Sequence, residues 1–357
     1  MSSGEGVGPV DSSARQILAE LRKTVVGQET AIRDLATLLA MHSEWFLNPD
    51  DDHTAPNALI IGPTGVGKTH AIRRAAQNLH IPLAVVDATQ LGGLGSGVNL
   101  EDILVELLTT SRRLMKEKKL PAGSLNDDGL AYLDELKVAS RGIVFIDEFD
   151  KIATRNKQTN ERNELVQRRL LQFIDGASVT LNPSPEASHQ EVTFNTAGLM
   201  FVVAGAFTGL TDDMGARPQP RARALDDPNQ IIPDDLVRFG FMKELIARIP
   251  VIIVFEELGP ADLVEILRNP ATDPSLFYQR YLKSLGADLV IDDSALTQIA
   301  SDAAALGIGA RGLHQRIFPL LARLSQQVED DPVEAVVLDQ AKLDRLDQEL
   351  ERIRLDR

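Results

Sequence analysis

One segment constrains the fold of this chain more than any other: a glycine-rich run between an apolar strand and a helix. Residues 62–69 read Gly-Pro-Thr-Gly-Val-Gly-Lys-Thr, a full G-x-x-x-x-G-K-T pattern. The apolar residues 58–61 precede it directly, and a helical pattern over 70–78 follows. In this order the glycines permit a tight turn whose backbone N–H groups converge on a phosphate at the positive end of a helix. The segment predicts an α/β fold built around a phosphate-binding loop.

A second strand end carries two adjacent acids. Residues 143–148 read Ile-Val-Phe-Ile-Asp-Glu, so an apolar strand ends in Asp147 and Glu148. Beside a phosphate loop, such an acid holds Mg²⁺ together with the loop hydroxyl, here that of Thr69, and its neighbour polarises an attacking water. We therefore expect Thr69 and Asp147 to bind Mg²⁺ and Glu148 to act as general base.

The same constellation predicts the cofactors. Lys68 is expected to reach the β- and γ-phosphates of a nucleoside triphosphate. A nucleoside triphosphate and Mg²⁺ are therefore the expected cofactors. The residues expected to contact the nucleotide are the loop and the residue after it: Gly62, Pro63, Thr64, Gly65, Val66, Gly67, Lys68, Thr69 and His70.

The charge balance excludes some partners. The chain has 37 Lys and Arg against 52 Asp and Glu, a formal net charge of −15. Such a chain repels polyanions in general, so direct binding to nucleic acid or to an anionic membrane is not expected. Any anion has to be bound at a local site, and the phosphate loop is one such site.

Cysteine is absent, which excludes disulfides, thiolate zinc sites and a thiol nucleophile. The longest apolar run, residues 199–207, is well short of the roughly 20 residues that span a bilayer. Residues 1–12 are small and polar, which predicts a disordered leader, and they lack the basic stretch and apolar core of a signal peptide. We expect a cytoplasmic protein.

Short apolar strands then alternate with helices along much of the chain. This alternation is typical of a parallel sheet covered on both faces, so we expect an α/β fold with one five-stranded parallel sheet. The polar stretches 182–195 and 211–233 are predicted to be loops. The predicted strands are 58–61, 83–87, 143–147, 199–203 and 251–255.

From residue 257 the pattern changes to amphipathic helices with one short strand. The predicted helices cover 260–268, 275–285, 293–306 and 310–327, and the strand covers 335–338. We therefore divide the chain into a large α/β nucleotide-binding domain, a smaller mostly helical domain and a charged C-terminal helix. Their predicted bounds are 13–256, 257–340 and 341–357.

Several blocks in a fixed order carry a resemblance to a known family. They are residues 25–28 (VVGQ), 87–89 (DAT), 142–152 (GIVFIDEFDKI), 205–210 (GAFTGL), 239–240 with 244–250 (FG, ELIARIP) and 309–313 (GARGL). Together with the phosphate loop they resemble the AAA+ ATPases of the ClpX/HslU group. The resemblance extends over nearly the whole chain. It implies the same two-domain P-loop fold, with ATP and Mg²⁺ as the cofactors.

The resemblance implies roles for three further residues. Val26 lies in the segment that packs on adenine. Arg248 matches the arginine finger, which acts on the nucleotide of a neighbouring subunit, and Arg311 matches the sensor-2 arginine, which couples nucleotide state to rotation of the small domain. With Glu148 and Lys68, these arginines form the expected catalytic set. The resemblance also implies a homo-oligomer, a hexameric ring that unfolds or remodels protein substrates as a chaperone.

The chain departs from the ClpX pattern in its first pore loop. In the family this loop carries an aromatic residue that grips a polypeptide. The corresponding residues here contain none: Gly93, Leu94, Gly95, Ser96, Gly97 and Val98. Ser96 takes the aromatic position, or Leu94 if the alignment shifts. A glycine-rich connector without any grip is the alternative interpretation.

The chain also departs from the ClpX/HslU pattern in three features by which those proteins recruit substrates or dock on a protease. The chain has no cysteine zinc domain, no Ile-Gly-Phe tripeptide in 211–233 and an ion-rich C-terminus. The leading hypothesis is therefore a ring-forming, ATP-hydrolysing protein remodeller that acts without the usual protease partner. The competing hypothesis is a nucleotide-dependent switch or scaffold that controls a dedicated effector or nucleic-acid-processing partner.

Overall fold

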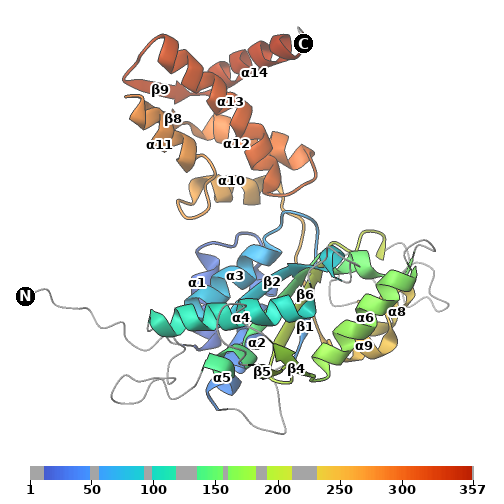
Figure 1. Cartoon of the computed structure of the whole chain (residues 1–357). Helices are drawn as coiled ribbons and strands as arrows, with labels where there is room; N and C mark the ends of the chain where they lie inside the picture. Colours follow the sequence, from blue (N-terminus) through green and yellow to red (C-terminus); the bar gives the residue numbers. More distant parts are fainter. Residues whose placement is uncertain are drawn as a thin grey trace, which may run out of the picture. The chain divides into compact units, whose positions relative to one another are not determined.

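The computed structural model describes residues 12–48, 56–91, 99–117, 135–155, 160–181, 191–210 and 231–355. The chain forms two compact units (Figure 1). The N-terminal unit comprises Met1–Arg22, Glu29–Gly62 and Lys68–Phe255, and the C-terminal unit comprises Lys23–Gln28, Pro63–Gly67 and Glu256–Arg357. Two short segments, Lys23–Gln28 and Pro63–Gly67, thus group with residues far along the chain, from Glu256 onward.

A five-stranded sheet forms the centre of the N-terminal unit. Its strands lie in the order β2-β3-β6-β1-β7, and every neighbouring pair is parallel. This confirms the predicted α/β fold and its five strands. β6 begins and ends later than the sequence predicts, and β7 ends one residue earlier. The strands are β1 (Ala58–Ile61), β2 (Leu83–Asp87), β3 (Ile143–Asp147), β6 (Met200–Gly205) and β7 (Val251–Val254).

Helices cover both sides of this sheet (Figure 1). Alternate strand residues, such as Leu59, Ile146 and Val203, pack into one cluster with Leu104 of α4 and Leu170 of α6. Burial on both faces explains why these strands are almost wholly apolar. The helices are α1 (Ala14–Arg22), α2 (Glu29–Leu47), α3 (Lys68–Leu79), α4 (Leu100–Lys116), α5 (Glu135–Ser140), α6 (Asn160–Ile174), α8 (Pro233–Phe239) and α9 (Lys243–Ala247), with 3₁₀ turns η1 (Ala88–Gln90) and η2 (Phe149–Ile152).

A two-stranded antiparallel sheet follows α6. It pairs β4 (Ser178–Leu181) with β5 (Val192–Asn195), and Phe194 is fully buried. The prediction of a loop over 182–195 is therefore wrong for the last four of these residues. Their alternation of apolar and polar side chains extends over only four positions, and it forms a strand because β4 supplies a partner for its backbone groups. Residues 182–190 of that prediction lie outside the described residues.

The C-terminal unit is mostly helical, as predicted. Its five helices are accompanied by one parallel pair of strands, β8 with β9, so the expectation of a single strand here is wrong. A lone strand leaves its backbone groups without partners, and residues 288–291 supply them. The elements are α10 (Pro260–Arg268), α11 (Leu276–Ser284), β8 (Asp288–Ile291), α12 (Asp293–Ala305), α13 (Arg311–Asp330), β9 (Ala335–Leu338) and α14 (Gln340–Leu355).

A half-buried arginine ties three helices of this unit together. Arg316 on α13 contacts Asp302 on α12 at 2.8 Å and Asp347 on α14 at 2.5 Å. Only 16% of its side chain is exposed, so solvent screens these pairs less than those at the surface.

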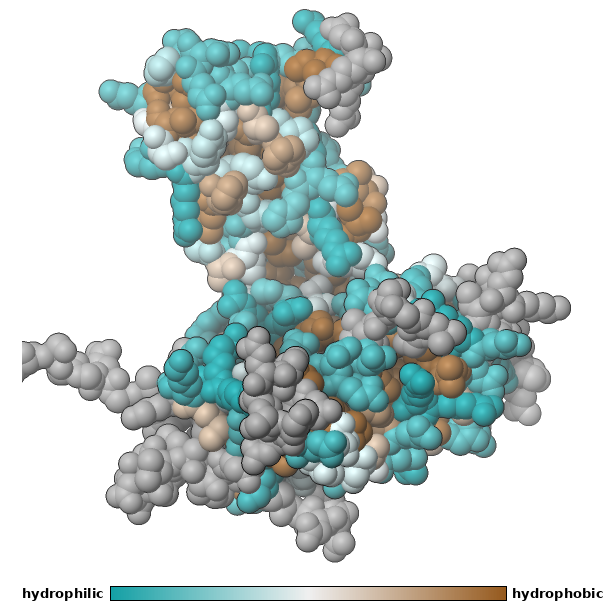
Figure 2. Space-filling view, viewed as in Figure 1, coloured by the Kyte–Doolittle hydropathy of each residue, from teal (hydrophilic) through white to brown (hydrophobic). Residues whose placement is uncertain are grey.

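The surface is varied in character. Hydrophilic residues predominate on the visible face of each unit, with hydrophobic patches among them (Figure 2). Across the described ranges, none of the helices combines the length and the apolar character that crossing a membrane requires. The leader predicted over 1–12 and the loop predicted over 211–233 fall almost wholly outside the described residues.

Candidate functional site

The glycine that ends β1 sits where no side chain fits. The N–H of Gly62 donates to the carbonyl of Gly205 at 3.2 Å. A Cβ atom on Gly62 would approach the carbonyl oxygen of Phe255 to 2.5 Å. Glycine is therefore required here because two neighbouring strands end against this point of the chain.

The loop that follows needs two more glycines for a different reason. Gly65 and Gly67 have φ values of +80° and +97°, a region that residues with a side chain rarely adopt. Val66 between them is buried, whereas Pro63 and Thr64 are exposed. The sequence pattern thus reflects a backbone conformation in which the loop turns sharply before α3 begins.

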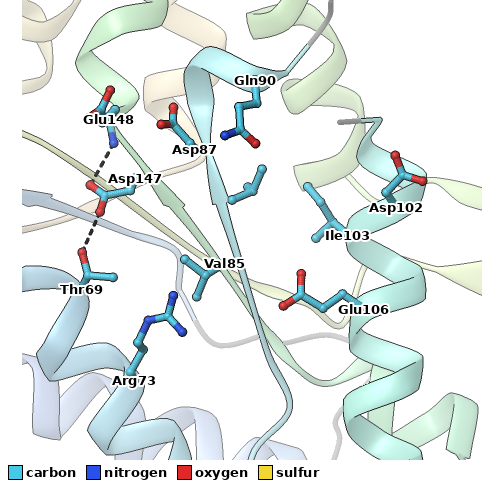
Figure 3. Close-up of a pocket in the computed structure, with 11 residues that line it drawn as sticks. Thr69, Arg73, Val85, Asp87, Gln90, Asp102, Ile103, Glu106, Asp147 and Glu148 are labelled. Atoms are coloured by element: carbon cyan, nitrogen blue, oxygen red, sulfur yellow. Dashed lines mark hydrogen bonds between the residues drawn. The ribbon is translucent and has the colours of Figure 1, made fainter. Parts of the chain in front are cut away.

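Helix α3 opens with the two residues that the motif singles out. Lys68 is buried, and its Nζ donates to the carbonyl of Gly62 at 2.6 Å. The hydroxyl of Thr69 donates to Oδ2 of Asp147 at 2.6 Å (Figure 3). The structure therefore brings Thr69 and Asp147 together from positions 78 residues apart, at the carboxyl end of the sheet.

The acid after Asp147 has an unusual backbone. Glu148 has φ 53° and ψ 32°, the left-handed region, and its N–H donates to Oδ1 of Asp147 at 2.9 Å. Such a conformation costs about 1 kcal/mol or more for a residue with a side chain and is concentrated at functional sites. The side chain of Glu148 is exposed, so it is accessible to a bound molecule and to water.

A cavity of about 410 Å³ opens beside these residues. Arg73 of α3 and Glu106 of α4 line it from opposite sides (Figure 3). Burial raises the pKa of the Glu106 carboxyl, while a backbone hydrogen bond from Val85 and the charge of Arg73 act in the opposite direction. The lining residues are Thr69, Arg73, Val85, Val86, Asp87, Gln90, Asp102, Ile103, Glu106, Asp147 and Glu148.

Arg73 and Glu106 were not expected in this region from the sequence. Arg73 follows Thr69 by four residues, one turn along the same helix, so helical spacing was the available signal. Glu106 lies on α4, far along the chain, and no local pattern marks it.

The donor atoms fit a magnesium ion. The hydroxyl of Thr69 and the carboxylate of Asp147 are hard oxygen ligands, the kind that Mg²⁺ prefers. They already lie in hydrogen-bonding contact, so both can reach one small ion without a change in fold. The roles assigned to these side chains remain predictions.

The segment that contains Val26 belongs to the C-terminal unit. Val26 is buried, and Gly27 has φ +71° with the carboxylate of Asp262 where a side chain would lie. Gln28 is buried and makes a double contact with the backbone of Glu256: its amide nitrogen donates at 2.9 Å and its oxygen accepts at 2.8 Å. In the sequence, Gln28 is marked only as part of the block 25–28.

The sensor-2 block lies in the same unit as the middle of the phosphate loop. The N–H of Ala310 donates to the carbonyl of Gly65 at 3.0 Å. Gly309 has φ +58°, and a Cβ there would meet Gly65 O at 2.7 Å. Arg311 is the first residue of α13 and has an exposed side chain. Within this unit the structure thus places residues 63–67 against residues 309–311.

Arg248 lies elsewhere, at the opposite edge of the sheet. It directly follows α9 as its C-terminal cap, three residues before Val251, which faces Ala58 at the amino end of β1. Gly62 follows the carboxyl end of the same strand. The four residues of β1 span about 13 Å, so the structure does not bring Arg248 to the phosphate-loop lysine of its own chain. The predicted pore-loop residues, Gly93 to Val98, lie outside the described residues.

Comparisons with known proteins identify the family of this chain. The family model for the AAA domain (Cdc48 subfamily) matches residues 53–252, more than half of the chain. The chain therefore belongs to the AAA+ ATPases.

Its relatives place it in the ClpX-like branch of that family, as the sequence resemblance predicts. The ATP-dependent Clp protease ATP-binding subunit ClpX of Treponema denticola is 31% identical over 351 residues, which cover 90% of this chain and 80% of that protein. ClpX of Azotobacter vinelandii is 31% identical over 82% of this chain and 69% of its own, and ClpX of Porphyromonas gingivalis is 29% identical over 89% and 78%.

Proposed function

We propose that this chain hydrolyses ATP in a ring of identical subunits and uses the reaction to remodel a protein partner. The observation that carries the proposal is the contact between Thr69 and Asp147, with the strained Glu148 directly after them. A phosphate loop, two oxygen ligands and an exposed acid at one strand end are the parts that hydrolysis of a nucleoside triphosphate requires.

Each residue of this group has a distinct task. The ammonium of Lys68 binds the β- and γ-phosphates. Residues Gly62 to His70 contact the nucleotide, and backbone N–H groups within this loop bind the phosphate oxygens. Thr69 and Asp147 would hold Mg²⁺, which when bound offsets the negative charge of the phosphates. Glu148 accepts a proton from the attacking water. Val26 contacts the adenine.

The two arginines complete the reaction centre. Arg248 stabilises the charge that spreads over the γ-phosphate, a contribution that reaches about 10³–10⁵-fold in enzymes of this type. Its place at the opposite edge of the sheet from Gly62 supports action on a neighbouring subunit rather than on its own. Activity therefore requires assembly, and we propose a homo-hexameric ring.

Arg311 couples hydrolysis to motion. It begins the long helix α13, and the residue before it is bonded to the phosphate loop within the C-terminal unit. We assign residues 13–256 to a nucleotide-binding domain, 257–340 to a lid domain and 341–357 to a charged terminal helix. A change at the phosphates would then move the lid and, with it, the ring.

The substrate is a protein. The ClpX relatives are named as ATP-binding subunits of a protease. For this chain we propose remodelling in the cytoplasm without the usual protease, since its sequence has no Ile-Gly-Phe tripeptide in 211–233. The net charge of −15 argues against direct action on nucleic acid or on a membrane.

One experiment tests the core of this proposal. Glu148→Gln retains the size of the side chain but removes the base, so the variant should bind ATP, assemble and retain the nucleotide without turnover. Affinity capture of this variant with ATP should also retain the protein partner, and capture with ADP is the matched control. The proposal fails if the wild-type protein neither assembles nor turns over Mg²⁺-ATP.

A second function is favoured by the altered loop. Residues 93–98 have no aromatic side chain, so a nucleotide-dependent switch or scaffold for a dedicated effector is the alternative. The double substitution Leu94→Ala with Ser96→Ala separates the two functions. Loss of partner remodelling with intact ATPase supports threading, whereas unchanged remodelling supports the switch.

A further inference from the structure

We propose that helix α6 positions the arginine finger of its own chain. In this inference Asp175, directly after the helix, orients the guanidinium of Arg248. Gln167, within the helix, attaches the segment that leads to Arg248 to the strand end that carries Asp147 and Glu148. The inference rests on the proposed function, because it assigns positioning residues for the same reaction.

The first observation is an ion pair. Nε of Arg248 lies 2.5 Å from Oδ1 of Asp175, with 59% and 41% of the two side chains exposed. A guanidinium has five N–H donors in a rigid plane, and an ion pair at Nε uses the donor that lies next to the side-chain stem. A guanidinium paired through Nε retains N–H donors on its terminal nitrogens, and these can contact a phosphate outside the chain.

The main chain of Arg248 is held as well. Its carbonyl accepts from Nδ2 of Asn57 at 2.9 Å, and Oδ1 of Asn57 accepts from the N–H of Phe201 at 2.8 Å. Its N–H donates to the carbonyl of Leu245 within the last turn of α9. Backbone and side chain are thus fixed by separate contacts, which restricts the position of the guanidinium more than either contact alone.

Gln167 joins two loops that lie far apart in the sequence. It is fully buried, and its amide nitrogen donates to the carbonyls of Ile152 and Gly240 at 2.8 and 3.1 Å. Its oxygen accepts from the N–H of Met242 at 2.8 Å. Ile152 ends the 3₁₀ turn after Glu148, and Met242 caps α9. A buried amide with all these bonds made is costly to displace, so it holds the two loops in one register.

Other contacts reinforce this junction. Thr154 donates to Gly240 O from both its hydroxyl and its N–H, at 2.8 and 2.9 Å. The rings of Phe149 and Phe241 stack with centroids 4.7 Å apart. Phe149 directly follows Glu148, and Phe241 lies two residues before α9, so apolar packing connects the same two regions as the amide bonds.

These contacts connect the segment after Glu148 to the segment that leads to Arg248 within one subunit. α6 packs against both η2 and α9. The group that hydrolyses a subunit's own ATP and the arginine that it offers to its neighbour are therefore held by one helix. Asp175 therefore determines the orientation of the Arg248 guanidinium toward the neighbouring subunit.

The test is Asp175→Asn in the full-length ring. The substitution removes the charge but retains the size, and a misaimed finger should lower kcat for ATP hydrolysis about tenfold with little change in KM for ATP. Asp175→Glu, which restores a carboxylate, should recover part of the loss. Glu164→Gln is the matched control, since Glu164 forms an exposed ion pair with Arg168 on the same helix.

A double variant shows whether Asp175 acts through the arginine. Asp175→Asn added to Arg248→Ala should lower kcat no further than Arg248→Ala alone, because the group that Asp175 orients is already gone. An unchanged kcat in Asp175→Asn, or an additive loss in the double variant, overturns the inference while leaving the proposed function intact. Absence of ATP turnover in the wild-type ring overturns both.

Discussion

The two edges of the central sheet differ in how their functional groups are held. At the carboxyl edge, Thr69 and Asp147 meet directly at 2.6 Å, and the residues follow from two compact motifs. At the amino edge, Arg248 is held by Asn57 and Asp175, which belong to no motif. The chemistry at the first edge is therefore visible in short patterns, whereas at the second edge it depends on contacts between distant segments.

The largest expected effect tests whether the groups at the two edges of the sheet act in different subunits. Arg248→Ala should lower ATP hydrolysis by about 10³-fold or more, because it removes the charge that stabilises the transition state. Mixing it with Glu148→Gln subunits should restore turnover, since each variant supplies the group that its neighbour lacks. The measurement is the steady-state ATPase rate across mixing ratios.

The control for this mixture is Arg168→Ala, an exposed arginine on α6 that is paired with Glu164. It should hydrolyse ATP like the wild type. If the mixture of Arg248→Ala and Glu148→Gln stays as inactive as its components, Arg248 does not act between subunits.

A smaller effect is expected at the carboxyl edge. Thr69→Val removes one oxygen ligand without changing the shape of the side chain, so the Mg²⁺ concentration for half-maximal hydrolysis should rise about tenfold or more. Thr69→Ser retains the hydroxyl and is the control. An unchanged Mg²⁺ requirement in Thr69→Val would show that this hydroxyl is not a ligand.

The smallest effect concerns pH at the amino edge. His42 is buried on α2, and its Nε2 is 3.0 Å from the carbonyl of Arg141, just before β3. Burial lowers its pKa from 6.5 to about 4, with the bond to Arg141 acting in the opposite direction. Below pH 6.5 the unfolded chain binds a proton that the folded chain does not, so stability falls as the pH is lowered toward 4.

His42→Gln should remove this contribution, because an amide donates to the same carbonyl without titrating. The free energy of unfolding should then fall less steeply than in the wild type, by about 1 kcal/mol per pH unit between pH 6.5 and 4. Denaturant titrations at several pH values measure it. His314→Gln, at an exposed position, should retain the wild-type slope, and an identical slope in all three proteins would contradict the prediction.

Much of the fold could be predicted because its signals are local. Each of the five strands is a largely apolar run, and α10 begins with Pro260 in its first turn. The four-residue strands β5 and β8 could not be predicted, because each includes polar residues and forms only where a partner offers its backbone groups. The sequence of either strand alone does not say where that partner lies.

The candidate site divides in the same way. Lys68, Thr69, Asp147 and Glu148 follow from residue type and spacing, because the phosphate loop and its acids need fixed neighbours along the chain. Gln167 and Asn57 could not be predicted. Their hydrogen bonds join residues separated by 73 and 191 positions, and only the packing of helices on the sheet brings such residues together.

The sequence by itself determined which residues form the candidate site: a phosphate loop with glycines at φ values that require them, and a pair of acids after a buried strand. The tertiary structure alone decided where each group lies. Parallel strands place their carboxyl ends at one edge, so the loop and acids meet there, while Arg248 lies at the other edge. The reason is the direction of the strands, a property of the assembled sheet rather than of any one segment.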